Sequence, residues 1–226
     1  MWQALEHAAD VETIIVAPEL LTSPGAPELM AAANEAGVSV VEVSSTAFDT
    51  ISQRDNPYGV AAIARARDER LRDLVVAPDS LFVALHAVGS PGNLGTIVRN
   101  VDAAGGSGVI TVGESTDVWH PTAVKASMGT VFSVPVCHVN QLADVISWCR
   151  DTHLSIVTTS AHAATAHWET TYPSPALFLF GSEGSGLDRS ALDSGDLAVR
   201  IPMAGSATSL NLAVAVGILL YEARGP

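Results

Sequence analysis

Apolar segments alternate with segments of helical character between residues 81 and 201, and this alternation limits the folds that the chain can adopt. We predict strands at 81–88, 108–112, 134–138, 155–159, 176–180 and 198–201. Helices are predicted between them, at 96–104, 121–128, 141–151 and 190–195. Strands that are apolar throughout and connected by helices are typical of a mainly parallel sheet with helices on both faces. The predicted fold class is therefore α/β.

Residues 1–70 are predicted to form a separate, smaller α/β unit. Its expected strands are 12–17, 38–43 and 59–64, and its expected helices are 3–9, 27–36 and 45–52, the last capped by Ser45. The unit is small for an independent core, and we expect it to be truncated at its start because an opening strand is missing. The charged segment 65–73 marks its end, so we assign 1–70 to the small unit, 71–79 to a linker and 80–226 to the large unit.

The composition excludes several classes of protein. A net charge of −13 argues against tight nonspecific binding to nucleic acid, although it leaves room for a local basic patch. The apolar runs are much shorter than the roughly 18 residues that span a bilayer, and the N-terminus has no signal-like pattern, so we expect a cytoplasmic protein without membrane contact. Cys137 and Cys149 are expected to be buried free thiols, and the histidines lack the paired spacing of a zinc site, so no metal is expected.

The first notable motif is SPGNLGTIVRN at residues 90–100, which follows a predicted strand directly. Asn93 or Thr96 is expected to cap the next helix, which would place Arg99 on its first turns. A cation is not stabilised by the helix dipole at that end of a helix. One interpretation is therefore that the planar guanidinium of Arg99 binds a phosphate through two hydrogen bonds. The alternative is an ordinary strand–turn–helix corner with a solvated arginine, and spacing alone does not separate the two.

The second motif is FGSEGSGL at residues 180–187, again directly after an apolar strand. Its glycines would let a ligand approach the backbone closely. The spacing matches neither the dinucleotide-binding fingerprint nor a P-loop, so the glycines alone are weak evidence. Glu183 is expected either to bind an amine of the ligand or to hold the loop.

The third motif spans residues 200–222, RIPMAGSATSLNLAVAVGILLYE. Pro202 and Gly205 exclude a regular helix in its first part, and Ser209 or Asn211 can cap a helix at 211–221. That helix is apolar on every side, so either its own core or a second subunit must cover it. A polar loop held over a buried helix is suited to binding a small molecule through backbone groups.

Together with HPTAVKASMGTVFSVPV at 120–136, these segments resemble the SpoU/TrmH family of RNA 2′-O-ribose methyltransferases of the SPOUT superfamily. The resemblance covers about residues 80–222 and is specific, because four separate segments agree in order. The N-terminal part, with VETIIVAPELL and DNPYGVAAIA, is more loosely similar to the ribosomal-protein-like RNA-binding domain of many family members.

The resemblance implies an α/β trefoil-knot fold, an obligate homodimer and S-adenosylmethionine bound by the loops of the knot. It implies backbone contacts to this cofactor from Gly181, Ile201 and Leu210. The cofactor-binding residues that it implies are Gly181, Ser182, Glu183, Gly184, Ile201, Pro202, Met203, Ser209, Leu210 and Asn211.

The implied reaction is transfer of a methyl group to a ribose 2′-hydroxyl of structured rRNA or tRNA. The resemblance makes Arg99 the residue that acts on the hydroxyl, with Asn93, from the same or the partner subunit, orienting Arg99 or the ribose. Arg99 could remove the proton with help from an RNA phosphate. Because a guanidinium holds its proton at neutral pH, we favour positioning and charge stabilisation.

Two other functions stay open at this point. The chain could bind the cofactor and RNA without turnover, although the presence of both Asn93 and Arg99 disfavours this. It could also methylate a substrate other than RNA, which would agree with the charge of −13.

Overall fold

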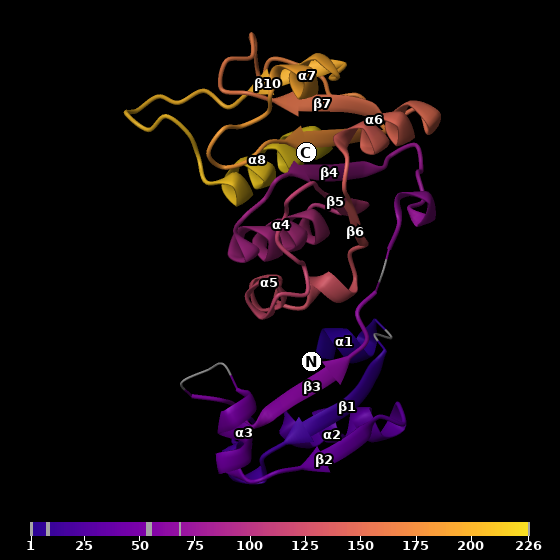
Figure 1. The fold of residues 1–226 in the computed structure, drawn as a ribbon, viewed down its shortest axis with the longest axis vertical. Helices are drawn as coiled ribbons and strands as arrows, with labels where there is room; N and C mark the ends of the chain where they lie inside the picture. The colour runs from indigo at the N-terminus through magenta and orange to yellow at the C-terminus, as the bar shows by residue number, and fades with distance from the viewer. Residues whose placement is uncertain (1, 8–9, 53–55, 68, 226) are drawn as a thin grey trace. The chain divides into compact units, whose positions relative to one another are not determined.

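The computed structural model describes residues 2–7, 10–52, 56–67 and 69–225. The chain divides into two compact units, Met1–Arg67 and Asp68–Pro226, which are described separately below (Figure 1). Part of the helix expected at 3–9 lies outside the described residues, and the helix that the structure shows there is α1, Trp2–Glu6.

The N-terminal unit contains a three-stranded sheet in the order β2–β1–β3. The central strand β1 (Val11–Val16) runs parallel to β2 (Ser39–Glu42) and antiparallel to β3 (Val60–Ala64). A 3-10 turn, η1 (Pro18–Leu20), and the helices α2 (Ala26–Glu35) and α3 (Ser45–Ile51) complete the unit. Its core contains Ile14, Leu29 and Phe48.

The cap predicted for α3 is wrong by one residue. Ser44 has extended backbone angles, and its hydroxyl accepts a hydrogen bond from the Ala47 amide at 3.2 Å. Ser45 is already helical, so its side chain cannot take the cap position.

The C-terminal unit is built on a seven-stranded sheet in the order β6–β5–β4–β9–β7–β10–β8. All of its recorded strand pairings are parallel, which confirms the predicted class of sheet. The two-residue strand β8 was not predicted. The strands are β4 (Leu81–His86), β5 (Gly108–Val112), β6 (Val136–Val139), β7 (Ser155–Thr159), β8 (Thr165–Ala166), β9 (Ala176–Phe180) and β10 (Leu197–Arg200).

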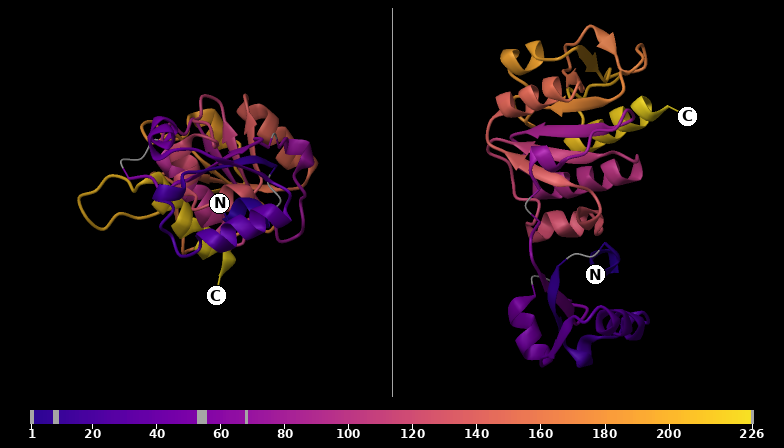
Figure 2. Two further views of the ribbon diagram at one scale, coloured as in Figure 1. Left: turned by 90° about the horizontal axis from the view of Figure 1, so that it is seen from below. Right: turned by 90° about the vertical axis from the view of Figure 1, so that its right-hand side faces the viewer.

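Helices cover both faces of this sheet, as predicted. On one face, α4 (Pro91–Ala103) and α8 (Leu212–Arg224) pack on alternate residues of β4 and β9. On the other, α6 (Leu142–Asp151) and α7 (Arg189–Asp193) pack on the remaining residues of those strands. The right-hand view of Figure 2 shows the two layers. The remaining elements are η2 (Leu71–Asp73), α5 (Pro121–Ala126) and η3 (Thr130–Phe132).

Helix α4 begins earlier than the sequence predicted. Ser90 is its cap and accepts a hydrogen bond from the Asn93 amide at 3.3 Å, and Pro91 occupies the first turn. Proline is suited to that position because the first helical amides have no partner within the helix. The predictions that Asn93 or Thr96 caps the helix, and that Arg99 lies on its first turns, are therefore wrong. Asn93 lies in the first turn and Arg99 in the third.

Helix α8 is capped by Asn211, one of the two residues predicted for this role. The Asn211 Oδ1 atom accepts hydrogen bonds from the amides of Ala213 at 2.9 Å and Val214 at 3.3 Å. The described residues of the C-terminal unit cover this helix on one side only, since Val214 and Tyr221 are 49% and 58% exposed.

Helix α4 packs closely against α5 and α8. A Cβ atom on Gly95 would lie 2.1 Å from the carbonyl oxygen of Ala123, so only glycine permits the approach of α5. The Asn100 amide donates a hydrogen bond to the Ala213 carbonyl of α8 at 2.8 Å.

Both cysteines are buried free thiols, as predicted. Burial raises the pKa of Cys137 and of Cys149 to about 12, so neither is a reactive thiolate at neutral pH. None of the described helices is long and apolar enough to cross a membrane.

Candidate functional site

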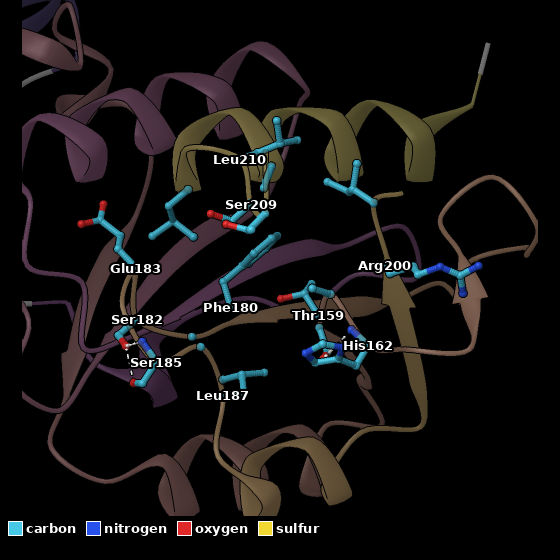
Figure 3. Close-up of a pocket in the computed structure, with 18 of the residues that line it drawn as sticks. Thr159, His162, Phe180, Ser182, Glu183, Ser185, Leu187, Arg200, Ser209 and Leu210 are labelled. Carbon is cyan, nitrogen blue, oxygen red and sulfur yellow. Dashed lines mark hydrogen bonds between the residues drawn. The ribbon is translucent and has the colours of Figure 1, made fainter. Parts of the chain in front are cut away.

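A cavity of about 790 Å³ lies at the carboxyl ends of β7, β9 and β10. This is the edge at which parallel sheets commonly bind ligands. Its walls come from the ends of these strands, the loop 181–187, the loop before α8, the α8 helix itself and the first turn of α4 (Figure 3). The second and third sequence motifs therefore meet in one pocket.

Most of the predicted site residues line this cavity. The exceptions are Arg99 and Pro202, which are not among its walls. The predicted residues that line it are Asn93, Gly181, Ser182, Glu183, Gly184, Ile201, Met203, Ser209, Leu210 and Asn211.

The loop 181–187 folds back on itself and depends on Gly181. A Cβ atom at this position would lie 2.0 Å from the carbonyl carbon of Gly186 and 2.3 Å from the Leu187 nitrogen. The Ser182 hydroxyl lies 2.8 Å from that of Ser185 and also accepts a hydrogen bond from its amide. The loop thus presents backbone groups and small side chains to the cavity in a fixed shape.

A chain of hydrogen bonds connects the three sequence motifs. The Asn93 side-chain amide donates to the Glu183 carboxylate, and the Asn211 side-chain amide donates to Asn93 Oδ1 at 3.0 Å. Because the Asn211 oxygen also caps α8, one side chain positions both the helix and Asn93. These contacts favour the second of the two roles predicted for Glu183, that of holding the loop.

Replacing Asn211 with alanine is expected to destabilise the protein by about 1 kcal/mol, because α8 loses its cap, and to weaken cofactor binding because Asn93 loses a partner. Asn211→Asp separates the effects, since aspartate keeps the capping oxygen but cannot donate to Asn93. Thermal unfolding measures the change in stability, and calorimetric titration with S-adenosylmethionine measures the change in cofactor affinity. If the aspartate variant lost as much stability as the alanine variant, capping would not explain the loss.

The far end of the cavity, opposite Glu183, is formed by residues that sequence analysis did not select. Thr159, the last residue of β7, and His162, which follows the strand, lie there (Figure 3). The neighbouring Arg200 guanidinium donates to the carbonyl oxygens of Ala163, at 2.7 Å, and Ala164, so its charge holds this loop. The one signal in the sequence was their position, because these residues lie at the carboxyl end of a strand or just beyond it.

Arg99 is exposed on α4, six residues beyond Asn93, which is about 9 Å along the helix axis. Within the described ranges, the structure shows no hydrogen bond or ion pair to its side chain. Its donors are therefore available to an anion from outside the chain.

The residues of the cavity fit S-adenosylmethionine. Its volume lies within the range of about 300–1,000 Å³ that is typical of small-molecule pockets. Phe180, Ile201 and Leu210 supply apolar walls for an adenine ring, and the backbone of the glycine loop supplies polar contacts. For a metal ion the described residues offer no group of three or more His, Cys, Asp or Glu side chains.

Comparisons with known proteins agree with this geometry. Residues 80–221 match the SpoU rRNA methylase family, and residues 2–62 match the MRM3-like substrate binding domain. The chain is 32% identical to the 23S rRNA (uridine(2479)-2′-O)-methyltransferase of Streptomyces viridochromogenes, over 97% of this chain and 78% of that protein. It is 29% identical to a 23S rRNA (guanosine(2553)-2′-O)-methyltransferase of Bacillus subtilis, over 84% and 75%.

A crystal structure of an AdoMet-bound rRNA methyltransferase from Sinorhizobium meliloti has the same fold. Its TM-score is 0.88, with 38% identity, and the match covers 99% of this chain and 83% of that one. The predicted fold class, an α/β trefoil-knot unit of the SPOUT type preceded by a small α/β substrate-binding unit, is confirmed. The resemblance found in the sequence is confirmed with it: the chain belongs to the SpoU rRNA methylase family.

Proposed function

We propose that this protein transfers a methyl group from S-adenosylmethionine to a ribose 2′-hydroxyl of structured RNA. The observation that carries the proposal is the cavity in which the loops 181–187 and 201–211 meet, with Asn93 of α4 bonded to both. The relatives above are named for methylating 23S rRNA, so ribosomal RNA is the first substrate to test, before tRNA.

Bound S-adenosylmethionine supplies a methyl group made electrophilic by the sulfonium. Gly181, Ile201 and Leu210 bind this cofactor through backbone groups, and Glu183, Asn93 and Asn211 keep the surrounding loops in place. Arg99 contacts the RNA, orients the ribose and stabilises the negative charge that develops on its 2′-oxygen. Arg99 suits this role because its side chain is exposed and has no hydrogen bond or ion pair to another described residue.

The test is transfer of a radiolabelled methyl group from S-adenosylmethionine to an unmodified 23S rRNA transcript and, separately, to unmodified tRNA. We expect label in the 23S transcript, retained in dinucleotides that resist alkaline hydrolysis, because a methylated 2′-oxygen cannot attack the neighbouring phosphate. If only tRNA were labelled, the proposed reaction would be correct but its substrate would be tRNA and not 23S rRNA. Cofactor binding without label in either RNA would contradict the proposal and favour a protein without turnover or a substrate other than RNA.

We further propose that the protein is a homodimer. In this dimer the exposed side of α8 in each subunit packs against the other subunit. The exposed side of α8 carries the large apolar side chains of Val214 and Tyr221. A helix that is apolar all round is stable only when it is covered all round, and the chain itself covers one side.

Val214→Asp is expected to shift the protein from dimer to monomer in sedimentation velocity, because dimerisation would bury an unpaired charge. Val75→Asp is the matched control, since Val75 is 81% exposed and lies outside α8, so it should leave the dimer intact. A wild-type protein that sediments as a monomer would contradict the proposal.

The protein is proposed to act in the cytoplasm, where ribosomal RNA is available, without a metal ion or a membrane partner.

A further inference from the structure

Most cationic side chains of the C-terminal unit are occupied by contacts within the chain. Arg150 pairs with Asp196, Arg189 with Asp193 and Arg72 with Asp73, while Arg200 and Arg224 donate to backbone carbonyl oxygens. Within the part of this unit that the structure describes, Arg99 and Lys125 are the cationic residues whose side chains show no hydrogen bond or ion pair. Among the described cationic residues of this unit, these two are therefore available to an anion, in a chain whose net charge is −13.

Both residues lie on helices that pack directly together. Arg99 is one turn beyond Gly95, the residue at which α4 touches the Ala123 carbonyl of α5, and Lys125 is two residues beyond Ala123. Figure 1 shows α5 beside α4. The side chains of Arg99 and Lys125 are both exposed.

The backbone that carries Lys125 is held firmly. Ser127 is fully buried, and its hydroxyl donates to the Val124 carbonyl at 2.8 Å and accepts from the Gly129 amide at 3.2 Å. Met128 follows with a φ of 54° while its side chain is 67% exposed. A residue other than glycine is strained in the left-handed region, and such strain is found most often at functional surfaces.

We propose that Lys125 binds a backbone phosphate of the RNA strand whose ribose is presented to Arg99. This inference rests on the proposed function and names a second point of RNA contact on the same helical pair. Lys125 lies outside the cofactor cavity, so it acts as a positioning residue through the RNA and not on the reacting atoms. Because the chain has a net charge of −13, each exposed positive side chain counts for more in attracting a polyanion.

Lys125→Gln tests this proposal because it removes the charge and keeps most of the side chain. We expect KM for the unmodified 23S rRNA transcript to rise about five- to tenfold, with kcat changed less than about twofold. The slope of log affinity against log salt concentration should fall by about one, the signature of one lost phosphate contact. The affinity for S-adenosylmethionine should stay unchanged, and Lys125→Arg should restore KM.

Arg189→Gln is the matched control, because Arg189 is 88% exposed but already paired with Asp193, so its loss should leave KM and the salt slope unchanged. If Lys125→Gln also left both unchanged in an enzyme that methylates the transcript, the inference would be wrong while the proposed function stood. If Arg189→Gln raised KM and lowered the salt slope as much as Lys125→Gln does, the effect would be one of overall charge. That result would overturn the inference as well. A wild-type protein that labels no RNA would contradict the proposed function itself.

Discussion

Arg99→Ala is expected to lower kcat for RNA methylation by a factor on the order of 10²–10³, with the affinity for S-adenosylmethionine nearly unchanged. Arg99 lies outside the cavity walls and has no recorded partner in the described chain, so its removal should disturb neither the pocket nor the fold. What is lost is the positive group that orients the ribose and stabilises charge on its 2′-oxygen. Single-turnover transfer to the 23S transcript and calorimetric titration with the cofactor measure the two quantities.

Arg99→Lys is the informative companion to this variant. Lysine keeps the positive charge but lacks the planar guanidinium with its paired N–H donors. It should therefore recover only part of the rate if Arg99 orients the ribose. A rate that recovered steeply with rising pH in the lysine variant would instead favour proton removal by this residue. If Arg99→Ala lost cofactor binding along with transfer, Arg99 would be a structural residue and the proposed role would be wrong.

Gly181→Ala is the second change with a large expected effect. The new Cβ atom would lie 2.0 Å from backbone of Gly186, so the loop 181–187 must move away from the cavity. Overpacking of this kind destabilises proteins by about 1–3 kcal/mol. We expect a lower melting temperature and a loss of S-adenosylmethionine affinity of more than about tenfold, since a displaced backbone cannot keep its contacts.

Gly89→Ala is the control for the same substitution. A Cβ atom on Gly89 would meet nothing within 4 Å, and the residue does not line the cavity. This variant should therefore keep both its melting temperature and its cofactor affinity. Wild-type binding by Gly181→Ala would mean that the loop can shift freely, and the rigid backbone cradle proposed for the cofactor would be wrong.

Much of this protein could be predicted from local sequence patterns. The apolar strands of the C-terminal unit determined its fold class, because segments such as β9 can only be buried between neighbouring strands with helices on both faces. Asn211 was recognisable as a helix cap, since capping depends on a side chain and the amides two and three residues ahead of it. The loops 181–187 and 201–211 stood out because each follows an apolar strand, but the individual residues assigned to the cofactor were implied by the resemblance to the SpoU/TrmH family.

Other features were decided only by the tertiary structure. The order of the strands and the meeting of Asn93 with Glu183 and Asn211 join segments about 90 and 118 residues apart in the chain. Two more features depend on the tertiary structure. Thr159 and His162 form a wall of the cavity, and α8 is only partly covered. The physical reason is that helical and strand periodicity is a property of neighbouring residues. A hydrogen bond or close contact between distant segments depends on how the whole chain packs.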